Sequence, residues 1–582
     1  MRTGLHCLWL RSAAIAVTAV GVAACTAVPQ QVVGPQTQVS IPQDWETYVS
    51  DFIEWTFKTR PDIAVWAGRH EYDGGIPDWS EAALRDEIAR LHRERDRAQA
   101  FEPATLTGER KFERKLVIAE INTRLFWLET AQWPYLSPSY YGWQLDPAVY
   151  LSREYAPLAT RMRAYVKYAN AIPAAANQIR RNLRTPMPRT YVGHGRIIFG
   201  GLARFFEHDV PEVFRGVDDP KLQEEFRAAN ASAIRAMSEL DTWLGQQERS
   251  ATDDFALGPE KFSQMLLQTE GVDVPLKRLR QIGEDDLARN LAALRDACTG
   301  FAPGAQLKEC VEKAAADKPQ TSTVDAASAQ LTELRLFIHD REIVTIPGTE
   351  QAMVRESPPY QRWNSAYIDV PGPFEKDLPG IYYVAPPDPA WTKSEQAAYI
   401  PSQSDLMFIS AHEVWPGHFL QFLHSNRSRS LPEKVFWSYA FGEGWAHYCE
   451  EMIWEAGFHA DDPEMHIGQI TNALLRDVRY ISAIGLHTAG MTVAESEQMF
   501  MTMAFQDAGN ARQQAARGTF DPAYGNYLLG KLMIRKLRED WTTTRGGRSS
   551  WKAFHDELLS HGSPPIPLIR EEMLGAGSGP PL

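Results

Sequence analysis

The stretch that most constrains this chain is His412–Gln421, HEVWPGHFLQ, where a His-Glu pair precedes a second histidine. Two neutral imidazoles beside a carboxylate are the groups that a helix presents to Zn²⁺ and to the water it activates. His412 and His418 are six residues apart, and on an unbroken helix this leaves their side chains about 120° from a common face. One metal ion can bind both histidines only if the helix is interrupted between them.

Pro416 gives a physical reason for such an interruption. Its ring lacks an N–H and clashes with the carbonyl four residues earlier, that of His412, and Gly417 adds backbone freedom directly after it. We expect a kink or a one-turn bulge that returns His418 to the side of His412, with Glu413 beside them as general base. The same pattern also fits two unrelated histidines on a kinked core helix. A third ligand elsewhere in the sequence is needed to distinguish a metal site from this alternative.

A candidate third ligand lies in the segment FGEGWAHYCEEM, which has helical periodicity. Glu443 follows His418 by 25 residues, enough for a loop and a second helix that runs back antiparallel to the first. A glutamate near a helix start also commonly faces solvent and interacts with the helix dipole. Glu450, two turns further along, is the alternative third ligand, and His424 and His447 are weaker competitors.

The order HExxPGHxxQ and then EGWAxYxE resembles the DUF885 family of bacterial proteins, which is similar to mostly helical zinc metallopeptidases of the carboxypeptidase, angiotensin-converting-enzyme and oligopeptidase types. Further segments that resemble the family are Phe255–Leu267, Arg476–Thr492 and Tyr527–Arg538. The likeness extends over about residues 41–575. Two positions depart from the family pattern: Ala483 stands where Asp is usual, and Met491 where Trp is usual. The first departure removes a possible acceptor for His487.

The resemblance implies a zinc centre with His412, His418 and Glu443 as ligands and with Glu413 as the base that accepts a proton from water. His487 and Tyr527 are candidate donors to the oxyanion, since related peptidases use an imidazole and a phenol for this purpose. Candidates for binding the carboxylate of a substrate are Arg476, Arg479 and Lys531. Core packing and solvated helix faces are the alternative explanations for these residues.

The expected function is therefore zinc-dependent hydrolysis of peptide bonds, of carboxypeptidase or dipeptidase type, with Zn²⁺ as cofactor and a peptide or amide as substrate. A zinc amidohydrolase that acts on a non-peptide amide would have the same centre. A metal-free lipoprotein that only binds peptide or cell-wall material is the alternative from another class. Glu413 argues against it, because a binding protein has no use for a general base beside two ligands.

The N-terminal residues predict export. Arg2 and Arg11 precede an apolar run over 13–24 that is too short to span a bilayer. We predict a signal peptide over residues 1–24 and, because VAAC resembles a bacterial lipobox, lipidation of Cys25. A plain secretory cleavage site nearby is the alternative. Residues 25–40, rich in Pro, Gln and Val, would form a tether, which places the protein in the periplasm with the lipid as its only membrane attachment.

Composition and periodicity predict a mainly α fold. The net charge of −14 argues against a nucleic-acid partner. Helices are expected at Trp45–Thr59, Glu81–Phe101, Gly108–Gln132, Pro157–Arg184 and Leu222–Leu244. We expect a large, two-lobed groove fold like that of metallopeptidases, with an N-terminal helical lobe (41–340) and a zinc-binding catalytic lobe (341–575). A small β region is expected around residues 345–389, where Ile381–Ala385 forms either an edge strand that holds substrate or a surface hairpin.

Three cysteines remain in the predicted mature chain beyond Cys25. Cys298 and Cys310 flank a loop that contains Gly and Pro, and the sequence leaves a disulfide and two free thiols equally open. Cys449 lies among the supposed ligands, where buried packing is the more common role of a lone cysteine.

Overall fold

The computed structural model describes residues 44–582 except 359–360, 363–364 and 390. These described residues form one compact unit. The predicted signal peptide, the tether and Cys25 lie outside the described residues. Within the described part of the chain, no helix combines the length and the apolar character that a bilayer span requires.

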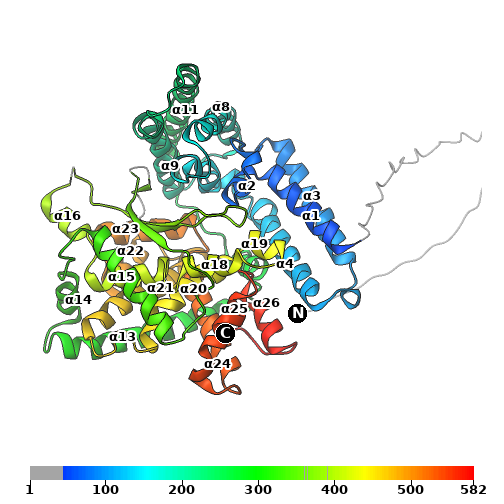
Figure 1. The fold of residues 1–582 in the computed structure, drawn as a ribbon. Coiled ribbons are helices and arrows are strands. Elements are labelled where there is room, and N and C mark those ends of the chain that lie inside the picture. The colour runs from blue at the N-terminus through cyan, green and yellow to red at the C-terminus, as the bar shows by residue number, and fades with distance from the viewer. Residues whose placement is uncertain (1–43, 359–360, 363–364, 390) are drawn as a thin grey trace, which may run out of the picture. The chain divides into compact units, whose positions relative to one another are not determined.

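The described residues are mainly helical, which confirms the predicted fold class (Figure 1). The longer helices of the first half are α1 (Trp45–Thr59), α3 (Glu81–Ala100), α4 (Gly108–Leu125), α8 (Leu158–Asn182), α9 (Arg189–His208) and α11 (Pro220–Gln247). Their apolar faces form one hydrophobic core, in which α11 packs against both α8 and α9. Short helices connect them: α2 (Pro61–Trp66), α5 (Trp133–Leu136), α6 (Ser139–Gly142), α7 (Ala148–Ser152) and α10 (Val210–Phe214).

A second hydrophobic core is formed mostly by helices that follow residue 258. These are α12 (Pro259–Glu270), α13 (Leu276–Phe301), α14 (Leu307–Ala315), α15 (Thr323–Asp340), α17 (Gln403–Glu413), α18 (His418–Ser425), α20 (Tyr439–Glu455), α21 (Pro463–Thr488), α22 (Val493–Met503), α23 (Ala508–Phe520), α24 (Asn526–Thr542), α25 (Trp551–Leu559) and α26 (Ile566–Leu574). The short helices α16 (Lys393–Tyr399) and α19 (Leu431–Val435) also follow residue 258 but are not part of this core. Val435 and Phe436 also follow residue 258 but pack in the first core, and so connect the two cores.

The sheet falls within the predicted β region and has three strands, β1 (Ala352–Glu356), β2 (Ala366–Asp369) and β3 (Gly380–Val384), in the order β1-β3-β2. β1 runs parallel to β3, with Val354 opposite Tyr382, and β2 runs antiparallel to it. The structure corrects both expectations for Ile381–Ala385. This segment lies mostly in the middle strand, between β1 and β2, and all five residues of β3 are buried.

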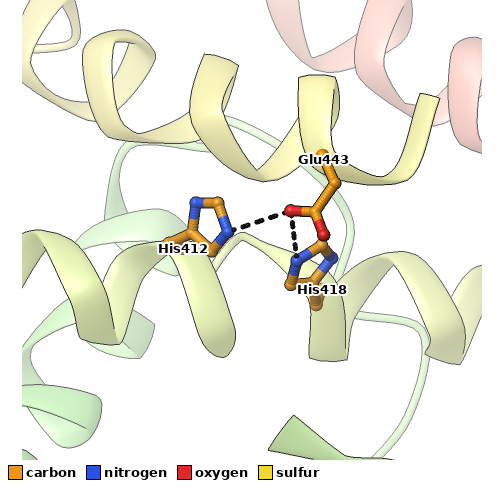
Figure 2. Close-up of side chains that lie close together, drawn as sticks. All are labelled: His412, His418 and Glu443. Atoms are coloured by element: carbon orange, nitrogen blue, oxygen red, sulfur yellow. Dashed lines mark ion pairs between the residues drawn. The ribbon is translucent and has the colours of Figure 1, made fainter. Parts of the chain in front are cut away.

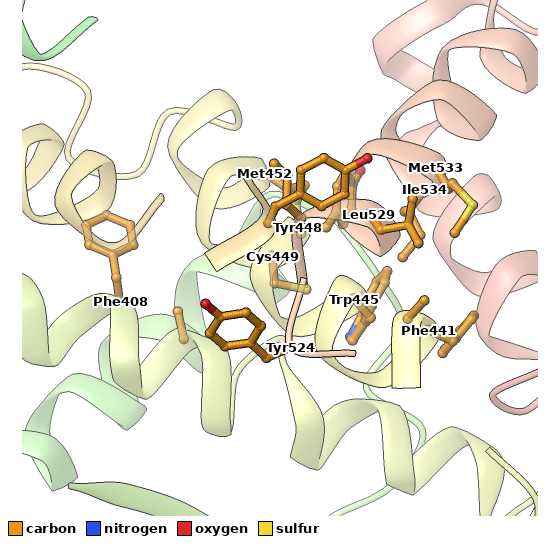
Figure 3. Packing of buried hydrophobic residues seen from close by; sticks show 14 of the residues in the cluster. Phe408, Phe441, Trp445, Tyr448, Cys449, Met452, Tyr524, Leu529, Met533 and Ile534 are labelled. Atoms are coloured by element: carbon orange, nitrogen blue, oxygen red, sulfur yellow. The ribbon is translucent and has the colours of Figure 1, made fainter. Parts of the chain in front are cut away.

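Cys298 and Cys310 form a disulfide that joins the end of α13 to α14. Cys449 is a free, fully buried cysteine on α20. Figure 3 shows it among apolar side chains of α20, with side chains of α24 close by. The predicted packing role of Cys449 agrees with this environment.

The helices α20 and α24 cross at a pair of glycines. A Cβ built on Gly530 would lie 1.8 Å from the carbonyl oxygen of Ala440, and one built on Gly444 would lie 2.4 Å from the Cα of Gly530. Only residues without a side chain allow the backbones to approach this closely. The crossing fixes the position of Tyr527, which is three residues from Gly530, relative to Glu443, which is next to Gly444.

We expect Gly530→Ala to destabilise the protein by about 3 kcal/mol, the upper end of the range for overpacked cores, because the new methyl group must push α20 and α24 apart. The free energy of unfolding from denaturant titration measures the effect. Gly201→Ala on α9 is the matched control: nothing lies within 4 Å of its added Cβ, so it should stabilise the helix slightly. Equal stability of the two variants would contradict the close crossing.

Candidate metal centre

The helix that begins at Gln403 ends at Glu413, and a new helix begins at His418. The predicted interruption at Pro416 is thus present, as a turn between two separate helices rather than a bulge within one. Gly417 donates its N–H to the carbonyl of Ala411 at 2.9 Å. A Cβ on Gly417 would lie 1.7 Å from the carbonyl oxygen of His412, so this tight turn accepts no other residue.

Side chains of α20 hold this turn from the other side. The indole Nε1 of Trp445 donates to the carbonyl of Pro416 at 3.0 Å, and the Sγ of Cys449 lies 3.5 Å from the same oxygen. Both side chains are fully buried. Carbonyl groups that the helix break leaves unpaired therefore find donors on the neighbouring helix.

His412, His418 and Glu443 converge on one point (Figure 2). The Nε2 atoms of both histidines lie 3.4 Å from the same carboxylate oxygen, Oε2 of Glu443, and the potential ligand atoms all lie within 4.8 Å of one another. The two imidazole rings are nearly perpendicular, at 89°. Among the described residues this is the group of His, Cys, Asp and Glu side chains that is arranged to hold a metal ion.

The donor set fits zinc, which favours imidazole nitrogen and carboxylate oxygen ligands. Oε2 of Glu443 is buried and has no hydrogen-bond partner among the described residues, although it lies between two imidazoles. A buried carboxylate oxygen without a partner is costly, and a cation bound by these three side chains would remove that cost. Three protein ligands also leave a position for water, as in catalytic rather than structural zinc sites.

Glu450 lies beside His412 and outside the group of three converging side chains. Its Oε1 lies 2.7 Å from Nδ1 of His412, so the opposite ring nitrogen, Nε2, points to Glu443. The side chain is fully buried, and Arg476 lies 3.5 Å from the same oxygen. Burial alone would raise the pKa of Glu450, but the charges of Arg476 and His447 outweigh it and hold the pKa below its ordinary value. A carboxylate on the far nitrogen is the common way to orient a metal-binding histidine.

Glu413 ends α17, directly after His412. Burial raises the pKa of its carboxyl group above the ordinary value, against the opposing effect of the two histidines. His424 and His447, the other histidines considered as metal ligands from the sequence, lie outside the group of three converging side chains. His424 makes a 2.8 Å hydrogen bond with the carbonyl of Thr345, and the fully buried His447 lies 3.4 Å from Glu450.

Tyr527 lies beside the cluster, and His487 does not. The Tyr527 ring stacks on His412 with centroids 6.2 Å apart, and burial together with the charge of Glu443 raises the pKa of the phenol. His487 donates from Nε2 to the carbonyl of Gly518 at 2.7 Å, and its Nδ1 accepts from the N–H of Leu257 at 3.2 Å. These backbone contacts use both ring nitrogens of His487, and burial lowers its pKa to about 4.

The three predicted carboxylate-binding residues have different surroundings. Lys531 is fully buried, and its charge is neutralised by Glu451 at 2.6 Å and Asp286 at 3.3 Å. Arg476 faces Glu450 and donates to the side chain of Asn472 at 2.7 Å. Arg479 lies beside Tyr527, with its Cζ 5.0 Å from the centroid of the ring.

Arg517 is a further residue of this region that sequence reasoning missed. It donates to the Tyr439 hydroxyl and to Asp521, both at 3.0 Å, and its Cζ lies 6.0 Å from the Tyr527 ring. Arg517 and Asp521 are four residues apart, which in a sequence indicates only an ordinary ion pair near a helix end. The sequence around Arg517 therefore does not indicate that this residue lies near the candidate metal centre.

Comparisons with known proteins agree on a family and a fold. The family model described as "Bacterial protein of unknown function (DUF885)" matches residues 61–573. A solved structure of a "putative lipoprotein of unknown function" from Shewanella oneidensis is 24% identical, with a TM-score of 0.75 over 91% of this chain and 100% of that one. Another "putative lipoprotein", from Colwellia psychrerythraea, is 16% identical, with a TM-score of 0.77 over 91% of this chain and 98% of that one. At these identities the likeness shows the fold. No curated protein matches the chain. Since the family model covers most of its length, this chain belongs to the DUF885 family of bacterial proteins.

Proposed function

We propose that this chain is a zinc-dependent peptidase that hydrolyses amide bonds. The observation that carries the proposal is the convergence of His412 and His418 on one oxygen of Glu443, with Glu413 directly next to a ligand. Two imidazoles, one carboxylate and an adjacent second carboxylate are the parts of a hydrolytic zinc site. The likeness of the sequence motifs to helical zinc metallopeptidases supports the same class.

Each residue has a separate task in this mechanism. Zinc held by His412, His418 and Glu443 would supply Lewis acidity. Glu413 accepts the proton of the attacking water and passes it to the leaving amine. The hydroxyl of Tyr527 donates a hydrogen bond to the carbonyl oxygen as negative charge develops on it. Glu450 keeps the ring of His412 in the orientation that binds the metal.

The proposal is tested by metal content and hydrolysis together. Elemental analysis of the purified chain should find about one zinc per molecule, and a mixture of short peptides should be cleaved. Treatment with a chelator should abolish cleavage, and added zinc should restore it. A purified, folded chain that neither contains nor takes up zinc would contradict the proposal.

Tyr527→Phe should retain zinc and lower kcat by roughly 10² to 10³, the typical effect of removing one oxyanion donor. Tyr524→Phe is a matched control, because it removes a buried hydroxyl three residues away and outside the cluster. Steady-state kinetics on a cleaved peptide measures both variants. An unchanged kcat in Tyr527→Phe would assign this side chain to packing alone.

The N-terminal residues support a second proposal, that the chain is an exported lipoprotein with lipid on Cys25. The short apolar run and the VAAC sequence support it, and so do the descriptions of the two solved structures. Fatty-acid labelling in a bacterial host should be lost in Cys25→Ser. Equal labelling of both proteins would contradict lipidation at this residue.

A further inference from the structure

Arg479 is a buried cation without an opposite charge beside it. Its side chain is on α21 and the residue is 8% exposed. Its Nε donates to Oε1 of Gln514 at 2.8 Å, and among the residues that the structure describes no carboxylate lies within the 4.0 Å of an ion pair. Burying an unpaired charge is costly, so such groups usually have a partner.

Two more arginines increase the positive charge at this position. Arg517 lies on the same Tyr527 ring, and Arg476 is one helical turn before Arg479 on α21. Burial and the charges of these neighbours lower the pKa of Arg479 to about 10. Arg517 has Asp521 as its partner, and Arg476 has Glu450. A negatively charged ligand at Arg479 would therefore relieve repulsion that the protein itself leaves uncompensated.

The position of Arg479 relative to the metal ligands limits the size of that ligand. The Tyr527 ring is near both, with its centroid 6.2 Å from that of His412 and 5.0 Å from Cζ of Arg479, so the sum of these distances is an upper limit on their separation. An extended peptide covers about 3.3–3.6 Å per residue. The guanidinium group is therefore no more than about three residues from the His412 ring.

We propose that Arg479, assisted by Arg517, binds the free α-carboxylate of a peptide substrate, so that the centre releases one to three residues from the carboxyl end. The inference rests on the proposed function and specifies its substrate class. Water adds across the C–N bond: the new C–O bond gives an acid on the amino-terminal fragment, and the proton goes to the amine of the released fragment. Lys531, whose charge is already neutralised, has no part in this binding.

The first test uses the unaltered, zinc-loaded chain and two sets of N-acetylated hexapeptides, one with a free carboxyl end and one with an amidated end. Mass spectrometry follows cleavage. We expect cleavage within three residues of the free end, and kcat/KM lower by on the order of 30- to 100-fold for the amides, the value of a charge-assisted two-point contact. Equal cleavage of both sets would overturn the inference and leave the proposed function intact.

Variants identify the residue responsible. Arg479→Gln should lower the ratio of kcat/KM for the free acids to kcat/KM for the amides by a similar factor, while Arg479→Lys should recover only part of the loss. Arg512→Gln is the matched control on α23, since its side chain is 71% exposed. Circular dichroism shows whether each variant is folded. A folded Arg479→Gln that still prefers acids by the full factor would overturn the assignment.

A binding measurement separates failure of the inference from failure of the proposed function. Equilibrium dialysis of zinc-loaded Glu413→Gln with the same two peptide sets should show tighter binding of the acids by on the order of 30-fold or more. Acid-selective binding without hydrolysis by the unaltered chain would support the carboxylate site and contradict the peptidase. Equal binding of acids and amides would overturn the carboxylate site, whatever the hydrolysis results.

Discussion

Replacement of Glu443 by alanine is expected to lower zinc affinity by at least about 100-fold and to abolish hydrolysis. This side chain supplies the one oxygen that faces both Nε2 atoms, and loss of a direct ligand exceeds the 10- to 100-fold effect typical of losing an outer partner. His412→Ala and His418→Ala should have the same effect. Metal titration with a competing chelator measures each affinity.

Glu450→Ala is the informative comparison, because Glu450 is on the same helix and contacts His412 at the other ring nitrogen. We expect it to weaken zinc binding by about 10- to 100-fold and to leave a measurable rate. The opposite result, in which Glu443→Ala keeps one zinc per chain and Glu450→Ala loses it, would show that the third ligand is Glu450.

Glu413→Gln is expected to keep zinc and to lower the rate of hydrolysis by about 10² to 10⁴, the typical contribution of a general base. The amide has the shape of the carboxylate but cannot accept the proton of water. Zinc content and single-turnover rates on one peptide measure the two effects separately. Full activity in the variant would assign the base to another residue, and loss of zinc would make Glu413 part of the metal site.

Helix positions could be predicted where the apolar pattern was regular. The expected helix at Trp45–Thr59 is present with the same bounds, and Leu222–Leu244 corresponds to a slightly longer α11. α9 was not predicted. Its sequence contains four glycines between residues 193 and 201, which weaken helix propensity, and packing against α11 compensates for this.

The convergence of His412 and His418 could also be predicted from the sequence, because their spacing and Pro416 are local features. The surroundings of the arginines could not, since they depend on how α21, α23 and α24 pack. From the sequence alone, Lys531 is a cation without a visible partner. Its partner Asp286 is 245 residues away in the sequence, and only the fold brings the two side chains together. Arg517 likewise belongs to no sequence motif, because its neighbours also depend on how these helices pack.

The contacts of Trp445 and Cys449 with the Pro416 turn have a consequence for the order of assembly. α20 carries Glu443, and it also holds the turn that sets His412 and His418 side by side. Before α20 docks, His412 and His418 are not held side by side and Glu443 is not next to them. The three potential ligands are then not yet gathered in one place. Tight zinc binding should therefore report on tertiary folding of the α17–α20 region, and a chain that is trapped before this docking step would bind zinc only weakly even with every ligand intact.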